Sequence, residues 1–130
     1  MGKILIVDDE SHIRLLLEQT LEDIEEKGVK IITANNGKKA VDIILTEKPD
    51  LVFLDLMMPE LNGYDVCNLV KKEHGMDDIY IVMLTAKGQE YDKRRGFEAG
   101  ADIYITKPFD PDFILDKAVE VFKNKGIKAT

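Results

Sequence analysis

Apolar residues in this chain fall into two patterns, short continuous runs and longer stretches with helical spacing. Three runs are almost wholly apolar, at residues 3–7, 51–54 and 79–84. Such runs are typical of strands that are buried on both faces of a parallel sheet. Residues 30–33 and 103–106 form two more strand-like runs that include polar side chains, so we expect them at or near the edges of the sheet.

The stretches between these runs have apolar residues three or four positions apart, which is the spacing of one face of a helix. Ser11 is the expected N-cap of the first helix, whose buried face comprises Ile13, Leu16, Leu17, Thr20, Leu21 and Ile24. Similar patterns predict helices over residues 37–47, 64–72 and 90–99, of which the last is the most polar.

The last helix of the chain has the clearest end signals. Asp110 is a suitable N-cap, Pro111 fits the first helical position, and Gly126 favours a stop. A wide arc of this helix is apolar, which predicts either a broad core stripe or a contact with a second copy: Phe113, Ile114, Leu115, Ala118, Val119, Val121 and Phe122.

Strand-like and helical segments alternate along the whole chain, which predicts parallel strands joined by right-handed helical crossovers. With the three apolar runs central and the two mixed runs outside, the strand order is 2-1-3-4-5. We therefore expect an α/β, flavodoxin-like, doubly wound (βα)5 fold with a five-stranded parallel sheet. The expected division is one domain over residues 1–125 and a C-terminal tail over residues 126–130.

Composition narrows the classes of protein. The 130 residues suit one domain of ordinary size, and 45% hydrophobic residues argue against intrinsic disorder. A net charge of -7 argues against direct binding of nucleic acid, because the chain would repel a polyanion. No apolar run approaches the roughly 20 residues of a membrane helix, and no signal peptide is evident. We expect a cytoplasmic protein without a membrane partner.

Cysteine and histidine add little chemistry. Cys67 is the only cysteine in the sequence, which excludes an internal disulfide and fits a reducing compartment. We expect it to be a small buried hydrophobic residue. His12 and His74 are expected at the surface, and the cationic run at residues 93–95 is expected on a solvated helix face.

Polar side chains suited to chemistry lie at the ends of the predicted strands. Asp8 and Asp9 follow the first strand, Asp55 ends the third, Thr85 the fourth and Lys107 the fifth. The carboxyl ends of parallel strands share one edge of the sheet, where ligand sites form at the switch point. We therefore expect three carboxylates, a hydroxyl and an ammonium group to converge there.

Three clustered carboxylates repel one another unless a cation lies between them. Oxygen ligands favour Mg²⁺, with Mn²⁺ as an alternative, and a set made of carboxylates disfavours zinc, which prefers histidine or cysteine ligands. A metal ion together with Lys107 and Thr85 would neutralise a phosphoryl group. Asp55 would then be a carboxylate nucleophile that forms an aspartyl phosphate.

Four motifs carry a resemblance to a known family: LIVDDE at residues 5–10, DLMMPELNGYD at 55–65, MLTAK at 83–87 and GADIYITKPF at 100–109. In this order and at this spacing they resemble the receiver domain of two-component response regulators, over nearly the whole chain. The resemblance implies a phosphoacceptor signalling domain that supports its own phosphorylation and dephosphorylation, rather than a conventional enzyme.

The resemblance also implies a role for each residue of the predicted site. Asp55 resembles the phosphoacceptor, and Asp9 resembles a direct Mg²⁺ ligand, with Asp8 positioning a water molecule on the metal. The remaining implied roles are a main-chain carbonyl ligand at Met57, phosphoryl contacts from Lys107 and Thr85, a switch aromatic at Tyr104 and an often-cis peptide bond before Pro108.

The same resemblance implies partners. The phosphoryl donor would be a sensor histidine kinase or a histidine phosphotransfer protein, and the output would pass to a downstream effector protein or domain. Phosphorylation would draw Thr85 to the phosphoryl group and let Tyr104 turn inward. The implied partner surface comprises the fourth expected helix (residues 90–99), the fifth expected strand (residues 103–106) and the last helix, which begins after Asp110. A phosphorylation-promoted homodimer is one form of output.

Three other classes of function use related folds or sites. A haloacid-dehalogenase-type phosphatase places its nucleophile after the first strand, whereas Asp55 follows the third. A flavodoxin-type FMN protein needs a phosphate loop after the first strand, where Asp8 and Asp9 would repel phosphate. A docking module that resembles a receiver but is never phosphorylated stays open, although every key position is filled.

Overall fold

The computed structural model describes residues 2–86 and 98–128 of the chain. Its strands form a five-stranded, all-parallel sheet in the order β2-β1-β3-β4-β5, which confirms the predicted order and the two predicted edges. The strands are β1 (Lys3–Val7), β2 (Lys30–Ala34), β3 (Leu51–Asp55), β4 (Tyr80–Ala86) and β5 (Ile103–Lys107). The central strand β3 is buried at every position, whereas β2 is mostly exposed or half-buried, which accounts for the polar residues of β2.

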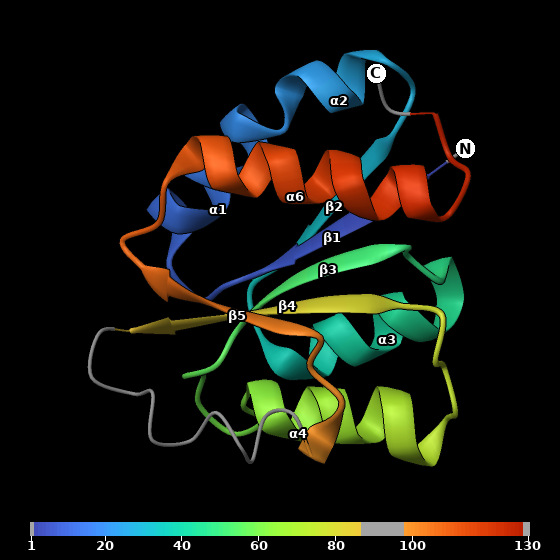
Figure 1. Ribbon diagram of the computed structural model, residues 1–130. Coiled ribbons are helices and arrows are strands. Elements are labelled where there is room, and N and C mark those ends of the chain that lie inside the picture. The colour runs from blue at the N-terminus through green and yellow to red at the C-terminus, as the bar shows by residue number, and fades with distance from the viewer. Residues whose placement is uncertain (1, 87–97, 129–130) are drawn as a thin grey trace.

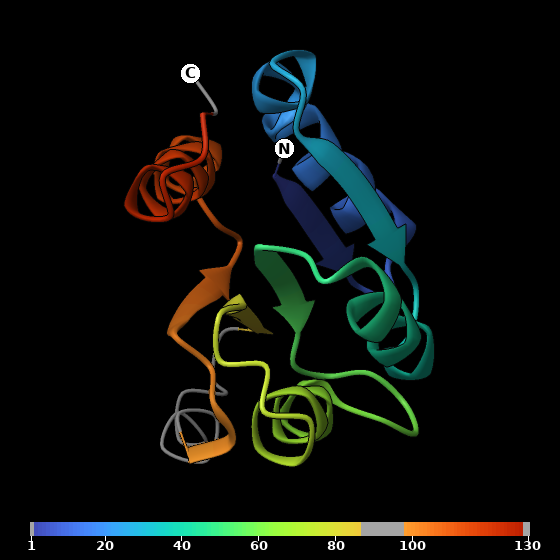
Figure 2. The same cartoon turned by 90° about the vertical axis from the view of Figure 1, so that its right-hand side faces the viewer.

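Helices cover both faces of the sheet (Figures 1 and 2). The described helices are α1 (Ser11–Thr20), α2 (Glu22–Glu26), α3 (Gly37–Glu47), α4 (Gly63–Cys67), the π-helix η1 (Asn68–Glu73) and α6 (Pro111–Asn124). In Figure 1, α1, α2 and α6 lie above the strands, and α3 and α4 lie below them. None of these helices has the length and apolar character that a bilayer span requires.

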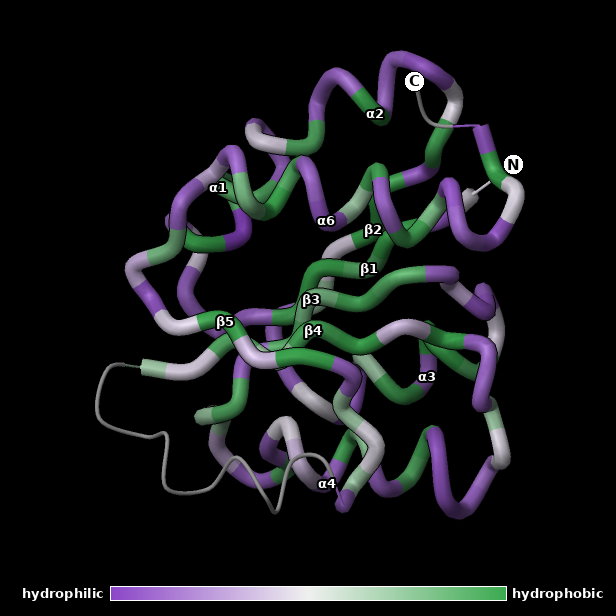
Figure 3. Tube along the Cα trace, in the orientation of Figure 1, coloured by the Kyte–Doolittle hydropathy of each residue, from purple (hydrophilic) through white to green (hydrophobic). Residues whose placement is uncertain are grey.

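The two helical layers form separate hydrophobic clusters with the two faces of the sheet. One cluster joins α1, α2 and α6 to the strands, and the other joins α3, α4 and η1 to them. In Figure 3 the central strands β1, β3 and β4 are mostly green, that is hydrophobic, and lie between these layers. Because burial of one large apolar side chain contributes roughly 1.5–3 kcal/mol, the clusters fix the strand ends on which the site is built.

The first helix begins earlier than predicted. Ser11 is its first residue and not its N-cap, because the carbonyl of Glu10 already accepts the N–H groups of Ile13 and Arg14, at 3.1 and 3.2 Å. Glu10 itself has an extended backbone and makes no side-chain cap. The start of α1 is therefore held by other contacts, among them the hydrogen bond from Arg14 to the carbonyl of Asp8.

The predicted buried face of this helix is also partly wrong. Leu16 is 38% exposed, since the face against the sheet runs through Leu17, Leu21 and Ile24. Leu21 has non-helical dihedral angles (φ -97°, ψ 7°) and separates α1 from α2. Its N–H still bonds to the carbonyl of Leu17 at 3.0 Å, so the interruption is a change of direction within one helical segment.

The remaining helices follow the predictions more closely. The helix expected over residues 37–47 is α3, and α6 begins at Pro111 with the side chain of Asp110 accepting the N–H of Asp112. The helix expected over residues 64–72 starts at Gly63 and widens into η1. The helix expected over residues 90–99, with its cationic run, lies outside the described residues except for positions 98 and 99.

Other predicted positions can be located directly. Cys67 is buried, and burial raises the pKa of its thiol to about 12, which fits an unreactive core residue. His12 and His74 are exposed, as expected. Ile127, in the predicted tail, donates its N–H to the carbonyl of Phe122 at 2.9 Å, so this part of the tail packs on the end of α6.

Candidate functional site

Four strand ends bring the predicted site residues to one edge of the sheet. Asp8 follows β1, Asp55 is the last residue of β3, Thr85 is the penultimate residue of β4, and Lys107 ends β5. Parallel pairing keeps these ends level, and in Figure 1 the ends of β4 and β5 point the same way. The edge predicted from the sequence is therefore the edge at which these side chains lie.

Asp8 is completely buried, and within the described residues it takes part in four hydrogen bonds. Its N–H donates to the carbonyl of Ala34 at 3.2 Å, and its own carbonyl accepts from Nη1 of Arg14 at 2.7 Å. Its carboxylate accepts the N–H of Glu10 at 2.9 Å and the ammonium group of Lys107 at 2.7 Å. A buried charge needs such partners, and they leave Asp8 little freedom to move.

Lys107 lies between two buried carboxylates. Its Nζ atom is 2.7 Å from Oδ2 of Asp8 and 3.2 Å from Oδ1 of Asp55, and Oε1 of Glu10 lies 3.9 Å away. Within the described residues, no hydrogen bond involves Oδ2 of Asp55. One ammonium group thus serves two carboxylates, and one oxygen of Asp55 remains available.

The pKa values follow from this crowding. Burial, aided by the negative charge of Asp8, raises the pKa of Asp55 from 3.8 to about 7, and Lys107 only partly opposes the rise. Burial lowers the pKa of Lys107, but the hydrogen bond to Asp8 and the charge of Asp55 outweigh it, so the net pKa is raised. The ammonium group therefore stays charged at neutral pH, where Asp55 titrates.

Thr85 brings an unsatisfied hydroxyl group to the same edge. It is completely buried, and its Oγ1 atom has no hydrogen-bond partner among the residues that the structure describes. An unpaired buried hydroxyl costs roughly 1–3 kcal/mol, so a bound group that accepted a hydrogen bond from Thr85 would relieve this cost. Tyr104 lies half-buried on β5, in register with Met83 of β4.

An acidic group beside Asp55 has the donor set of a hard cation. Carboxylate oxygens of Asp8, Asp9 and Glu10 lie within 4.8 Å of one another, and Asp9 and Glu10 are exposed. Carboxylates without thiolate or imidazole ligands suit Mg²⁺ or Mn²⁺. Asp55 is not a member of this group; Lys107 bridges it to Asp8.

The loop after Asp55 passes close under the strand end. Asn62 and Asp65 form a capping box at the start of α4, with side-chain to backbone distances of 3.0 Å in both directions. A Cβ atom at Gly63 would lie 2.9 Å from the carbonyl oxygen of Asp55 and 2.6 Å from Sδ of Met83. Only glycine fits there, so the start of α4 is in direct contact with the strand end that carries Asp55.

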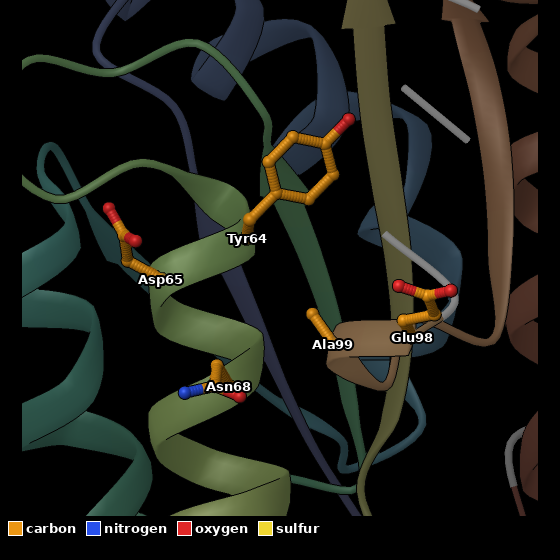
Figure 4. Close-up of a pocket in the computed structure, with 5 residues that line it drawn as sticks. All are labelled: Tyr64, Asp65, Asn68, Glu98 and Ala99. Carbon is orange, nitrogen blue, oxygen red and sulfur yellow. The ribbon is translucent and has the colours of Figure 1, made fainter. Parts of the chain in front are cut away.

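A separate hollow of about 300 Å³ lies beside α4 and is lined by Tyr64, Asp65, Asn68, Glu98 and Ala99. Figure 4 shows Tyr64, Asp65 and Asn68 along α4 and the start of η1, with Glu98 and Ala99 on the helical segment opposite. None of the predicted phosphoryl or metal residues lines it. It is therefore distinct from the acidic edge.

Sequence reasoning missed two residues at the acidic edge. Glu10 belongs to the acidic group, and its place directly after Asp9 was the available signal. Arg14 donates to the carbonyl of Asp8; its signal was a cation one helical turn after an acidic loop. The Lys107–Pro108 peptide bond, whose isomer the sequence left open, is cis. Met57, the predicted carbonyl ligand, is 60% exposed.

The family model and the curated relatives that match this chain indicate the same family. Residues 4–119 match the family model described as the response regulator receiver domain. A probable transcriptional regulator, ycf27, of Porphyra purpurea is 45% identical over 96% of this chain and 52% of its own length. The alkaline phosphatase synthesis transcriptional regulatory protein PhoP of Bacillus subtilis is 43% identical over 98% of this chain and 51% of its own length. The chain thus spans about half the length of these curated relatives.

Solved structures agree with the sequence relatives. A putative response regulator from Chloroflexus aurantiacus superposes with a TM-score of 0.82 at 32% identity, over 94% of this chain and 98% of that one. A CheY-like receiver domain protein from Methanospirillum hungatei gives 0.79 at 33% identity, over 95% of each chain.

Proposed function

This chain belongs to the receiver domain family of response regulators, and on that premise we propose that Asp55 is its phosphoacceptor. The proposed donor is a phosphohistidine on a sensor histidine kinase or a histidine phosphotransfer protein. The domain covers residues 1–125 in this proposal, acts in the cytoplasm and supports its own phosphorylation and dephosphorylation.

The observation that carries the proposal is the environment of Asp55. The side chain of Asp55 is 6% exposed, one carboxylate oxygen is bound to Lys107 at 3.2 Å, and the other has no partner within the described residues. A carboxylate with one free oxygen beside a fixed cation suits attack on a phosphoryl group, because the cation neutralises the incoming charge.

The residues present fit a divalent cation. We propose that Asp9 binds it directly, that Asp8 positions a water on it, and that Asp55 and the carbonyl of Met57 complete the protein ligands. The support is the acidic group of oxygen donors next to a carboxyl with a pKa of about 7. When bound, Mg²⁺ supplies positive charge to carboxylate and phosphoryl oxygens.

The chain's own residues then have distinct tasks in transfer. An oxygen of Asp55 forms a bond to phosphorus while the bond from phosphorus to the donor's imidazole nitrogen breaks, and the imidazole leaves with that electron pair. Lys107 pairs with a phosphoryl oxygen, and the hydroxyl of Thr85 donates to another. Positioning and charge neutralisation account for most of the catalysis in such transfers.

The proposed output is a change of the surface formed by the helix expected over residues 90–99, most of which lies outside the described residues, together with β5 and α6. Movement of Thr85 toward the phosphoryl group makes room for Tyr104 to turn inward. β5 is an edge strand, and Phe113 on α6 is 47% exposed, so both can contact an effector protein, an effector domain or a second copy. If the phosphorylated protein stays monomeric in light scattering at high concentration, the homodimer is excluded as the output.

Intact mass spectrometry after incubation with acetyl phosphate tests the function. We expect a gain of one phosphoryl group that requires Mg²⁺ and is absent in Asp55→Asn. Steady turnover of a phosphate ester would instead favour the phosphatase class. No gain by a folded protein, together with no binding of beryllofluoride, would favour the docking module that is never phosphorylated.

A stability measurement tests the metal site separately. Mg²⁺ should raise the melting temperature of the wild type, because it binds the folded state. Asp9→Ala should abolish this gain, while Asp42→Ala on the exposed face of α3 should keep it. Equal stabilisation of the wild type and Asp9→Ala would contradict the proposed ligand.

A further inference from the structure

We infer that Arg14 is a positioning residue that holds Asp9 in place, an inference that depends on the proposed role of Asp9 as a metal ligand. Arg14 lies in the first turns of α1 and is half-buried. Within the described residues, its side chain makes no hydrogen bond to Asp55, Thr85 or Lys107 and donates instead to the backbone of the acidic loop.

Arg14 bonds to the residues on both sides of Asp9. Its guanidinium Nη1 donates to the carbonyl of Asp8 at 2.7 Å, and its backbone N–H donates to the carbonyl of Glu10 at 3.2 Å. The Arg14 side chain therefore holds the peptide unit before Asp9, and the peptide unit after Asp9 donates through the N–H of Glu10 to Oδ1 of Asp8 at 2.9 Å. Asp9 itself is exposed and makes no hydrogen bond that the described residues record, so its position depends on its neighbours.

The N-terminus of α1 has no side-chain cap. A helix N-terminus is commonly anchored by a side chain of the N-cap residue, but Glu10 makes no such bond. Asp8 is held independently by Lys107 and Ala34. The guanidinium bond from Arg14 thus links a fixed strand end to the start of the helix, across the residue proposed to bind metal.

Charge and position make opposite predictions for Arg14. A positive side chain near a cation site weakens cation binding by repulsion, so loss of the charge alone would tighten binding. Loss of a residue that orients a metal ligand weakens binding, typically 10- to 100-fold. We therefore expect Arg14→Met to weaken Mg²⁺ binding by roughly 10-fold, and the direction of the change separates the two effects.

The experiment compares Arg14→Met, Arg14→Lys and the control Gln19→Met, an exposed position on the same helix, by calorimetric titration with Mg²⁺. We expect weaker binding in Arg14→Met, partial recovery in Arg14→Lys because an ammonium group can donate to the same carbonyl, and no change in the control. Equal or tighter binding by Arg14→Met would overturn the inference.

A second measurement does not need the metal. In the metal-free protein, hydrogen exchange of the Glu10 amide, which donates to Asp8 at 2.9 Å, should be faster in Arg14→Met than in the wild type. The amide of Lys39, bound to Asn36 at 2.8 Å, should exchange at the same rate in both. Unchanged Glu10 exchange would refute the positioning role even where Mg²⁺ binds. Wild type that binds no Mg²⁺ would overturn the proposed site along with this inference.

Discussion

The two edges of the sheet use aspartate in opposite ways. At the amino-end edge, Asp50 accepts the N–H of Lys3 at 2.9 Å and donates its own N–H to the carbonyl of Lys3 at 2.9 Å. Asp102 makes the same reciprocal pair with Ile81, at 2.7 and 2.9 Å. Each carboxylate there extends the pairing of two neighbouring strands by one residue, so its charge stabilises the sheet.

At the carboxyl-end edge, Asp8 and Asp55 instead share the single ammonium group of Lys107, and the hydroxyl of Thr85 has no partner within the described residues. This edge keeps unfavourable charge and an unpaired donor. Proteins accept such local cost at sites where a ligand relieves it. The contrast indicates that the amino-end edge is built for strand register and the carboxyl-end edge for binding.

Removal of Lys107 should produce the largest effect. Lys107→Met leaves two buried carboxylates without a cation, and breaking a buried ion pair on one side costs roughly 3–5 kcal/mol. We expect a loss of about 3 kcal/mol in metal-free urea unfolding, part of which saturating Mg²⁺ restores. Lys38→Met, at an exposed position of α3, is the control. A loss of stability that Mg²⁺ does not reduce would contradict the proposal that the carboxyl-end edge binds a cation.

Asp102→Ala should cause the next largest loss of stability, and this loss should not depend on Mg²⁺. It removes the acceptor for the N–H of Ile81 and a partner of Lys71 at 3.5 Å. A hydrogen bond to a charged group contributes roughly 1.5–3 kcal/mol, so we expect a loss of about 2 kcal/mol with and without Mg²⁺. Asp116→Ala on the exposed side of α6 should change little. If the loss of stability in Asp102→Ala depended on Mg²⁺, the amino-end edge would not be independent of the metal site, which would contradict the distinction between the edges.

Asp55→Asn should stabilise the metal-free protein, and its effect should depend on pH. The pKa of Asp55 is raised from 3.8 to about 7, so the folded state binds the proton more tightly than the unfolded state. The wild type therefore loses stability as the pH rises from about 4 to about 7. We expect a gain of about 1–2 kcal/mol at pH 8, less than the shift alone implies because Lys107 loses a partner, and little gain near pH 4. Unfolding curves at both pH values measure it.

Thr85→Val should give a smaller gain. The two side chains have similar shapes, and valine removes the buried hydroxyl that lacks a partner within the described residues. Removal of an unsatisfied buried polar group favours folding by roughly 1 kcal/mol. We expect this gain in the melting of the metal-free protein, whereas Thr46→Val on α3, where the hydroxyl donates to Asp42 at 2.9 Å, should give none. A destabilised Thr85→Val would mean that the hydroxyl is satisfied in solution.

The sequence was informative wherever burial decides the structure. The apolar runs predicted the strands and their order, because a strand covered on both faces must be apolar throughout, as β3 is. Parallel topology then predicted that Asp55 and Lys107, far apart in the chain, meet at one edge. These inferences need only periodicity and the geometry of parallel sheets.

The sequence was less informative wherever a single hydrogen bond decides. Nothing in the pattern distinguished Ser11 from Glu10 as the N-cap, since the outcome depends on which carbonyl accepts the first helical bonds. The position of Arg14 one helical turn after an acidic loop was a signal for a cation there, but it did not indicate that the guanidinium group bonds to the backbone carbonyl of Asp8. The widening of the helix into η1 at Asn68 likewise has no marker such as proline or glycine within it.

The smallest expected effect has the opposite sign to that of Asp55. Glu47 lies near the amino-end edge, where its Oε1 atom is 3.1 Å from Nζ of Lys3 and 3.3 Å from Nζ of Lys30. The hydrogen bonds from Lys3 and then Lys30 lower the pKa of Glu47, so its contribution to stability is present above the ordinary carboxyl pKa and is lost as the pH falls through the lowered value. Because these side chains are partly exposed, salt screens the pairs. We expect Glu47→Gln to lower the melting temperature slightly at pH 7 and low ionic strength, and to match the wild type in high salt or in acid. If Glu47→Gln raised the melting temperature as Asp55→Asn should, carboxylates at both edges would be equally strained, and the functional meaning of the contrast would be lost.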